Sequence, residues 1–174
     1  GARRLVAFLG GTIGNLLPAE RRAFLRTLRS LLAPGDRLLI GVDLVKDVAV
    51  LEAAYDDATG VTAAFNRNVL AVINRELDAN FALEHFAHVA FYDREREWIE
   101  MRLRALVDQT VRVGRLGLTV RFAAGEEMRT EVSCKFTHAS LERALNSAGL
   151  GLLELHTDPK QRFAVAIAGR DATS

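Results

Sequence analysis

The hydrophobic pattern of this chain changes its period twice, and that change restricts the folds the chain can adopt. Up to about residue 43, and again from about residue 135, continuous apolar runs alternate with apolar stripes of helical spacing. Such runs are typical of buried strands, and such stripes are typical of helices that cover a sheet. From about residue 89 to 132, apolar and polar residues alternate one by one, as in half-buried strands. We therefore expect an α/β layer that is interrupted by a segment of another architecture.

The first layer is predicted to begin with a βαβ unit. The apolar run 5–9 ends in two glycines, and a helix is expected to open near Pro18, a residue tolerated in a first helical turn. The sequence Pro-Gly-Asp at 34–36 ends that helix, and the run 38–42 predicts the next strand. A crossover between parallel strands of one sheet is expected to be right-handed.

The middle of the chain predicts two helices, at 47–58 and 61–78, followed by strands. The second helix is expected to face the core with Phe65, Val69, Val72, Ile73 and Leu77. Along 99–105, the apolar side chains are expected to point one way, and Glu100, Arg102 and Arg104 the other. Further antiparallel strands are predicted at 111–113, 118–122 and 128–133.

The α/β pattern then returns. Thr137 is a plausible helix N-cap, Gly149 suits the end of that helix, and two apolar runs follow at 150–155 and 163–168. The predicted divisions are an α/β segment at 1–43, an inserted α+β domain at 44–134 and a resumed α/β segment at 135–174.

Composition argues against several classes of partner. The net charge is +1 and the basic residues are mixed with acidic ones, so nothing favours nucleic acid or an anionic membrane. No apolar run reaches the ~18 residues that a membrane-spanning helix needs. The one cysteine, Cys134, excludes an internal disulfide and indicates a reducing compartment, so we expect a cytoplasmic protein.

Side chains that bind metals or act as nucleophiles are sparse. His85 and His88 lie near each other, but no cysteine or carboxylate completes a ligand set. Cys134 is typical of a small buried hydrophobe, and no Gly-x-Ser-x-Gly motif occurs. We expect no metal site and assign no residue a catalytic role.

A glycine-rich turn, Gly-Gly-Thr-Ile-Gly-Asn at 10–15, follows the first predicted strand. It is neither a P-loop nor a dinucleotide-binding motif. Two interpretations stay open, a tight turn that needs positive φ and a ligand site at the carboxyl end of a buried strand. In the second interpretation, Asn15 would offer the ligand both a donor and an acceptor.

Two other segments carry polar side chains that could bind a ligand. Tyr55 stands at the end of a predicted amphipathic helix. Glu131 and Ser133 alternate along one predicted strand and therefore share a face. A carboxylate beside a hydroxyl could bind a cationic or NH-bearing heterocycle, whereas the alternative interpretation is a solvated strand end.

These segments together resemble one protein family. The matching sequences are FLGGTIGN at 8–15, GVDLVKD at 41–47, AYDD at 54–57, GVTAAFN at 60–66 and TEVSCKF at 130–136. In this order they are similar to the histidine Nα-methyltransferases of ergothioneine biosynthesis, and the resemblance covers essentially all 174 residues. It implies a transferase that uses S-adenosylmethionine to trimethylate the α-amine of L-histidine, giving hercynine. It also implies the C-terminal part of a Rossmann-like methyltransferase sheet with an inserted α+β substrate-binding domain.

The resemblance implies roles for single residues. By matching motif, Asn15 is expected to hold the amino-acid backbone of the substrate, and Tyr55 to contact its carboxylate. Glu131 and Ser133 resemble the pair that recognises the imidazole. The pocket wall is expected to include Gly10, Thr12, Phe65 and Met101.

The family's cofactor loop and ribose-binding acidic residue belong to an N-terminal half, and this chain contains neither motif. Most of the S-adenosylmethionine site is therefore expected outside this chain, its cofactor-binding residues stay unassigned, and the chain alone is expected to be inactive. The strand 5–9 would expose one edge, which a complementary N-terminal half or self-association would cover. Two alternatives stay open, namely a related methyltransferase for another amino acid and a non-catalytic amino-acid-binding or assembly fragment.

Overall fold

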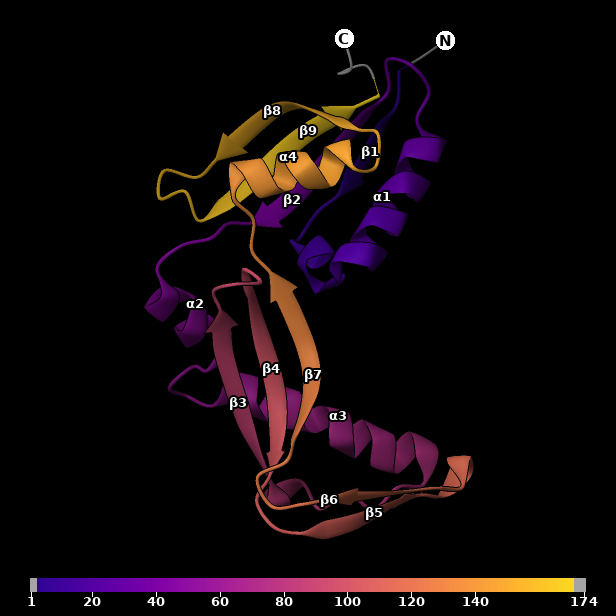
Figure 1. Cartoon of the computed structure of the whole chain (residues 1–174), viewed down its shortest axis with the longest axis vertical. Helices are drawn as coiled ribbons and strands as arrows, with labels where there is room; N and C mark the ends of the chain where they lie inside the picture. The colour runs from indigo at the N-terminus through magenta and orange to yellow at the C-terminus, as the bar shows by residue number, and fades with distance from the viewer. Residues whose placement is uncertain (1–2, 171–174) are drawn as a thin grey trace. The chain divides into compact units, whose positions relative to one another are not determined.

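The computed structural model describes residues 3–170, which form two compact units (Figure 1). The first unit comprises the chain up to Asp47, residues 94–98 and the chain from Val132 onward. The second comprises Val48–Asp93 and Ile99–Glu131. The inserted domain at 44–134 stays a prediction.

The first unit is built on a four-stranded mixed sheet. Its strands, in spatial order, are β1 (Leu5–Phe8), β2 (Arg37–Asp43), β9 (Phe163–Gly169) and β8 (Gly151–Thr157). β1 and β2 are parallel, whereas β9 is antiparallel to both of its neighbours. This arrangement confirms the predicted α/β class.

Two helices cover one face of this sheet. α1 (Pro18–Leu31) begins at the predicted proline, and α4 (His138–Asn146) follows Thr137, whose Oγ1 accepts a hydrogen bond from the Ser140 backbone N at 3.1 Å. Alternate side chains of β2 are fully buried in the apolar cluster that the two helices share with the sheet. The residues of that cluster from β2, α1 and α4 include Leu38, Ile40, Leu25, Leu28, Leu141 and Leu145.

Asp36 ties the beginning of β2 to the beginning of β1. Its carboxylate accepts hydrogen bonds from the backbone N of Ala33 at 2.8 Å and of Arg4 at 2.9 Å, and from Arg4 Nη2 at 2.6 Å. These hydrogen bonds lower the pKa of Asp36 to about 2, and the bond from the backbone N of Ala33 contributes most. The carboxylate is therefore ionised wherever the protein is folded above that pH.

The second unit combines two helices with strands of a separate three-stranded sheet. The helices are α2 (Val48–Tyr55) and α3 (Val61–Leu77), and the sheet has the order β3 (Phe86–Asp93), β4 (Trp98–Ala105) and β7 (Glu127–Cys134). In Figure 1, β4 runs opposite to β3 and β7. β5 (Gln109–Val113) and β6 (Leu118–Phe122) form an antiparallel pair. Short 3₁₀ turns lie at η1 (Thr12–Asn15), η2 (Leu83–His85) and η3 (Gly114–Leu116).

The predicted core face of α3 is partly wrong. Phe65 is 66% exposed and Val69 is 39% exposed, whereas Asn66 and Leu70 are buried. Asn66 belongs inside because its Nδ2 donates to the backbone O of Arg102 at 3.1 Å and to His88 Nδ1 at 2.9 Å. Hydrophobic spacing could not reveal a buried amide whose partners come from other elements.

His88 connects α3 to the end of α2. Its Nε2 lies 2.8 Å from the backbone O of Tyr55, and because a carbonyl can only accept, Nε2 is the donor. The neutral ring then accepts the bond from Asn66 at Nδ1. His88 is therefore a structural link among the elements of the second unit.

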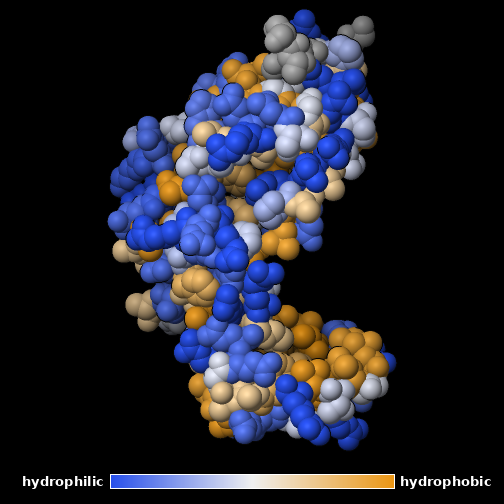
Figure 2. Space-filling view, viewed as in Figure 1, coloured by the Kyte–Doolittle hydropathy of each residue, from blue (hydrophilic) through white to orange (hydrophobic). Residues whose placement is uncertain are grey.

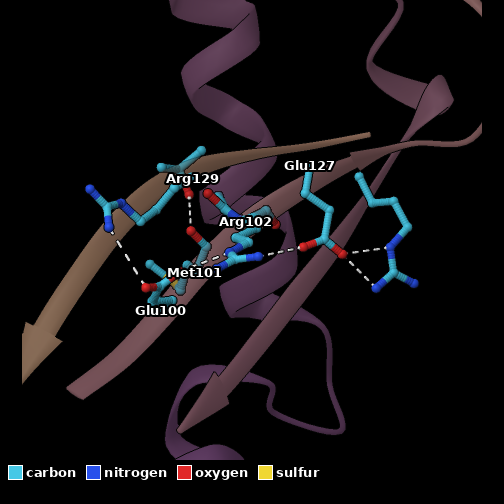
Figure 3. Close-up of polar contacts among 8 residues, drawn as sticks. Glu100, Met101, Arg102, Glu127 and Arg129 are labelled. Atoms are coloured by element: carbon cyan, nitrogen blue, oxygen red, sulfur yellow. Dashed lines mark hydrogen bonds and ion pairs between the residues drawn. The ribbon is translucent and has the colours of Figure 1, made fainter. Parts of the chain in front are cut away.

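The face of β4 that carries Glu100, Arg102 and Arg104 is partly buried. Arg102 and Arg104 reach the surface in part, but Glu100 is only 3% exposed. Arg102 Nη2 lies 2.5 Å from Glu100 Oε2, and Arg129 lies 3.7 Å from the other oxygen (Figure 3). Charge pairing makes this burial possible, since an unpaired buried carboxylate is costly.

Arg102 is the centre of this cluster. Its Nη1 donates to Glu127 at 2.9 Å, and Arg104 holds the other oxygen of Glu127 at 2.6 Å. The guanidinium also lies over the ring of Phe91, 4.8 Å from its centroid. Hydrogen bonds from Arg102 and then Arg104 lower the pKa of Glu127. We refer to Glu100, Arg102, Arg104, Glu127 and Arg129 as the arginine cluster.

Apolar side chains reach the surface elsewhere in the second unit. Besides those on α3, Leu116 is 62% exposed and Leu118 is 48% exposed, beside the turn that joins β5 to β6. Figure 2 shows apolar surface gathered in the part of the molecule that carries α3, β5 and β6.

Candidate functional site

The glycine-rich turn follows the carboxyl end of β1 as the sequence predicts. Gly10 and Gly11 have φ values of 85° and 72°, a backbone conformation that favours glycine. The chain then forms η1, in which Ile13 and Gly14 are buried while Thr12 and Asn15 are exposed. The turn therefore presents the polar side chains of Thr12 and Asn15 to solvent at the end of a strand.

Gly14 brings this turn against the end of β7. A β-carbon at Gly14 would lie 2.8 Å from the carbonyl oxygen of Cys134 and 3.5 Å from the hydroxyl oxygen of Ser133. No real β-carbon tolerates the first distance, so this approach requires glycine. Gly14, from the motif at 8–15, thus lies against Ser133 and Cys134, from the motif at 130–136, within the first unit.

Ser133 is part of a buried polar chain. The ammonium of Lys135 donates to Ser133 Oγ at 2.8 Å and pairs with Asp43 Oδ2 at 2.8 Å. The Lys135 side chain is fully buried, and Asp43, the last residue of β2, is 27% exposed. Lys46 pairs with the other oxygen of Asp43 at 2.5 Å.

Backbone hydrogen bonds hold this polar chain in place. Phe136 N donates to the backbone O of Asp43 at 2.8 Å, and Val45 N donates back to Phe136 O at 3.0 Å. Lys135 N donates to the backbone O of Glu97 at 2.7 Å. The segment that carries Ser133 and Lys135 is therefore fixed beside the end of β2.

Sequence reasoning gave no role to Lys135 or Asp43, although both lie within the motifs that carry the family resemblance. A signal was present, because a lysine between a buried cysteine and a buried phenylalanine implies an acidic partner. The identity of that partner could not be read from the sequence, since Asp43 is remote along the chain.

The other predicted site residues belong to the second unit. Tyr55 is half-buried at the end of α2 and packs on the apolar cluster that contains Met101, which is 3% exposed. Phe65 is exposed on α3, and Glu131 is half-buried on β7. Their roles, and those of Gly10, Thr12, Asn15 and Ser133, stay predictions.

Within residues 3–170, the structure contains no group of three or more side chains of the kinds that hold a metal ion. Over the same residues, none of the helices combines the length and the apolar character needed to cross a membrane. Cys134 is buried at 4% exposure, which confirms its interpretation as a small core residue.

Comparison with known proteins decides the family. A family model described as histidine-specific, S-adenosylmethionine-dependent methyltransferase matches residues 1–170. The chain belongs to this family. It is also similar to the CcbJ methyltransferase of Streptomyces caelestis, with a TM-score of 0.49 and 16% identity, over 97% of this chain and 58% of that chain.

Two curated relatives in the family are mycobacterial. The chain is 59% identical over 97% of its length to the histidine N-alpha-methyltransferase of Mycolicibacterium smegmatis, of which it covers 52%. It is 55% identical over 98% of its length to the protein of the same name from Mycobacterium tuberculosis, of which it covers 53%. The chain thus spans about half the length of these relatives.

The first unit does not by itself fit the cofactor of this family. S-adenosylmethionine carries a ribose whose hydroxyls suit a carboxylate acceptor at the end of a strand. Asp43 stands at such a position, but the ammonium groups of Lys135 and Lys46 each pair with one of its oxygens and balance its charge.

Proposed function

We propose that this chain supplies the substrate-binding part of an enzyme that transfers methyl groups from S-adenosylmethionine to the α-amine of L-histidine, giving hercynine. The observation that carries this proposal is the family match, which extends over residues 1–170 and concerns a histidine-specific family. The high identity to two histidine N-alpha-methyltransferases supports the same substrate.

The proposed work of this chain is to bind and orient the amino acid. When bound, S-adenosylmethionine supplies an activated methyl group, so the protein mainly has to hold the amine in line with it. Such positioning is worth up to roughly 7–11 kcal/mol of the barrier. The exposed amide of Asn15, at the end of η1, suits this role because it can both donate and accept without being a strong base.

Selection of histidine requires polar groups that stay unsatisfied when another side chain binds. Glu131 and Ser133, both on β7, are our candidates for the imidazole. Tyr55 is our candidate for the substrate carboxylate, and Gly10, Thr12, Phe65 and Met101 are candidates for the surrounding wall. Each of these roles is a proposal.

We further propose that another polypeptide segment completes the sheet of the first unit. β1 is the last strand in the sheet order, and Leu5 at its start is 61% exposed. An open edge with apolar side chains favours pairing with a further strand. A complementary N-terminal half would supply that strand together with the cofactor site, and self-association is the competing outcome. With one cysteine in the chain, a reducing cytoplasmic setting suits this assembly.

Calorimetry on the complete gene product with S-adenosylhomocysteine tests the proposal. We expect histidine to bind, and tryptophan and tyrosine to bind much more weakly. Glu131→Ala should weaken histidine binding far more than Leu103→Val, a matched change at a core position of β4 that is fully buried. Equal histidine affinities for the two variants, or stronger binding of tryptophan or tyrosine, would refute the substrate assignment.

A further inference from the structure

The polar chain at the end of β7 has a fixed direction. As an ammonium, Lys135 has three donors and no acceptor, so it donates the 2.8 Å hydrogen bond to Ser133 Oγ. A hydroxyl has one proton and two lone pairs. Because Lys135 occupies one lone pair, the proton of Ser133 points away from Lys135.

Asp43 makes this direction permanent. The Lys135 side chain is fully buried, and a buried ammonium is stable only with a paired carboxylate. Asp43 provides that pair at 2.8 Å, and its own backbone O is bonded to Phe136 N at 2.8 Å. Side chain and backbone therefore fix the ammonium relative to Ser133.

We propose that Lys135, held by Asp43, is a positioning residue that makes the Ser133 hydroxyl a hydrogen-bond donor toward the substrate. This inference rests on the proposed histidine substrate and deepens it. A donor at Ser133 requires an acceptor on the ligand, and the unprotonated nitrogen of a neutral imidazole is such an acceptor. Lys135 thus sets which form of the imidazole the site prefers, without touching the ligand.

The competing explanation is that the ion pair between Lys135 and Asp43 only stabilises the fold. A variant of Lys46 distinguishes this explanation from a positioning role. Both lysines pair with Asp43, Lys135 at Oδ2 and Lys46 at Oδ1. Lys46 donates a hydrogen bond to the backbone O of Arg162 at 2.9 Å, and the structure shows no hydrogen bond from Lys46 to Ser133. Lys46→Met therefore removes one of the two ammonium groups that pair with the Asp43 carboxylate. It leaves the hydrogen bond between Lys135 and Ser133 intact.

The test measures two affinities of the complete gene product by calorimetry with S-adenosylhomocysteine, one for histidine and one for β-(2-thienyl)alanine, whose ring has no nitrogen acceptor. Their ratio reports recognition of the ring nitrogen. We expect Lys135→Met to lower the preference for histidine about fivefold to tenfold, the usual weight of one hydrogen bond. Lys46→Met should leave the ratio within about twofold.

A double-mutant cycle distinguishes positioning from general damage to the fold. In a Ser133→Ala background, Lys135→Met should no longer change the ratio, because the hydroxyl that it orients is gone. If Lys135→Met does not fold, the variant D43N/K135M removes both charges of the pair and should show the same loss of preference. An unchanged ratio, or an equal loss for Lys46→Met, would overturn the proposal. Failure of the proposed function looks different, since the unmodified protein would then show no preference for histidine.

Discussion

Gly14 lies so close to Cys134 that a β-carbon on Gly14 would stand 2.8 Å from the carbonyl oxygen of Cys134. That oxygen is backbone and cannot rotate away. Gly14→Ala should therefore lower the free energy of unfolding by about 1–3 kcal/mol, the usual cost of overpacking. Urea denaturation measures the change.

The neighbouring residue provides the control. Asn15 is exposed at the end of η1, so Asn15→Ala should alter stability by less than about 0.5 kcal/mol while weakening histidine binding. Equal stability of the two variants would contradict the contact between the turn and the end of β7.

Asn66 is predicted to stabilise the second unit through its buried amide. Asn66→Ala removes the bonds to His88 and to the backbone O of Arg102, leaving both acceptors without this donor. The expected loss is about 1–3 kcal/mol in the free energy of unfolding. Asn68→Ala, an exposed change on the same helix, should cost far less. A similar loss for both variants would contradict the assigned role of Asn66.

The arginine cluster gives a graded prediction. Arg102→Met leaves the buried Glu100 without its close partner and should lower stability by about 2–3 kcal/mol, less than for a fully buried pair because Arg102 is 32% exposed. Arg104→Met should cost less than about 1 kcal/mol, since Arg104 is 48% exposed and Glu127 keeps its bond to Arg102.

A rescue checks the physical reason for this gradient. Adding Glu100→Gln to Arg102→Met removes the buried charge that has lost its close partner and should restore part of the lost stability. Thermal and urea denaturation both report the change. If Glu100→Gln destabilises the protein further, the buried carboxylate is not the cause of the stability lost in Arg102→Met.

Asp36 predicts a dependence of stability on low pH. Its folded pKa of about 2 lies below the value of about 3.9 in an unfolded chain, so the unfolded state takes up the proton first. The stabilisation is fully present above about pH 4 and is lost as the pH falls toward 2.

Urea midpoints measured at pH 6 and at pH 2.5 test this. Asp36→Asn should lower the midpoint at pH 6 and have a smaller effect at pH 2.5. Glu142→Gln, at an exposed position on α4, serves as the matched control. An effect of Asp36→Asn that stays the same at both pH values would argue against the hydrogen-bonded carboxylate.

The sequence predicted the layers of the fold well, because burial on both faces leaves a continuous apolar run. The run at 38–42 became β2, and the proline and threonine signals marked the starts of α1 and α4. The inner face of α3 was mispredicted in part, and the burial of Glu100 was not predicted. Both depend on polar partners from other elements, and a hydrophobic period carries no information about such partners.

The sequence likewise predicted only part of the candidate site. The sequence located the turn at Gly10–Asn15 and the strand end at Ser133, and Gly14 brings these two together. It could not reveal that Lys135 and Asp43 support Ser133, because that pairing depends on how the end of β7 meets the end of β2. Residues remote in sequence became neighbours through backbone hydrogen bonds that only the structure records.

The most direct test of the central claim is to incubate the complete gene product with S-adenosylmethionine and an equimolar mixture of histidine, tryptophan and tyrosine, and to identify the products by mass spectrometry. We predict that histidine alone gains methyl groups, all on its α-amine, and accumulates as the trimethylated product. Unmodified histidine, or methylation of tryptophan or tyrosine in its place, would contradict the account.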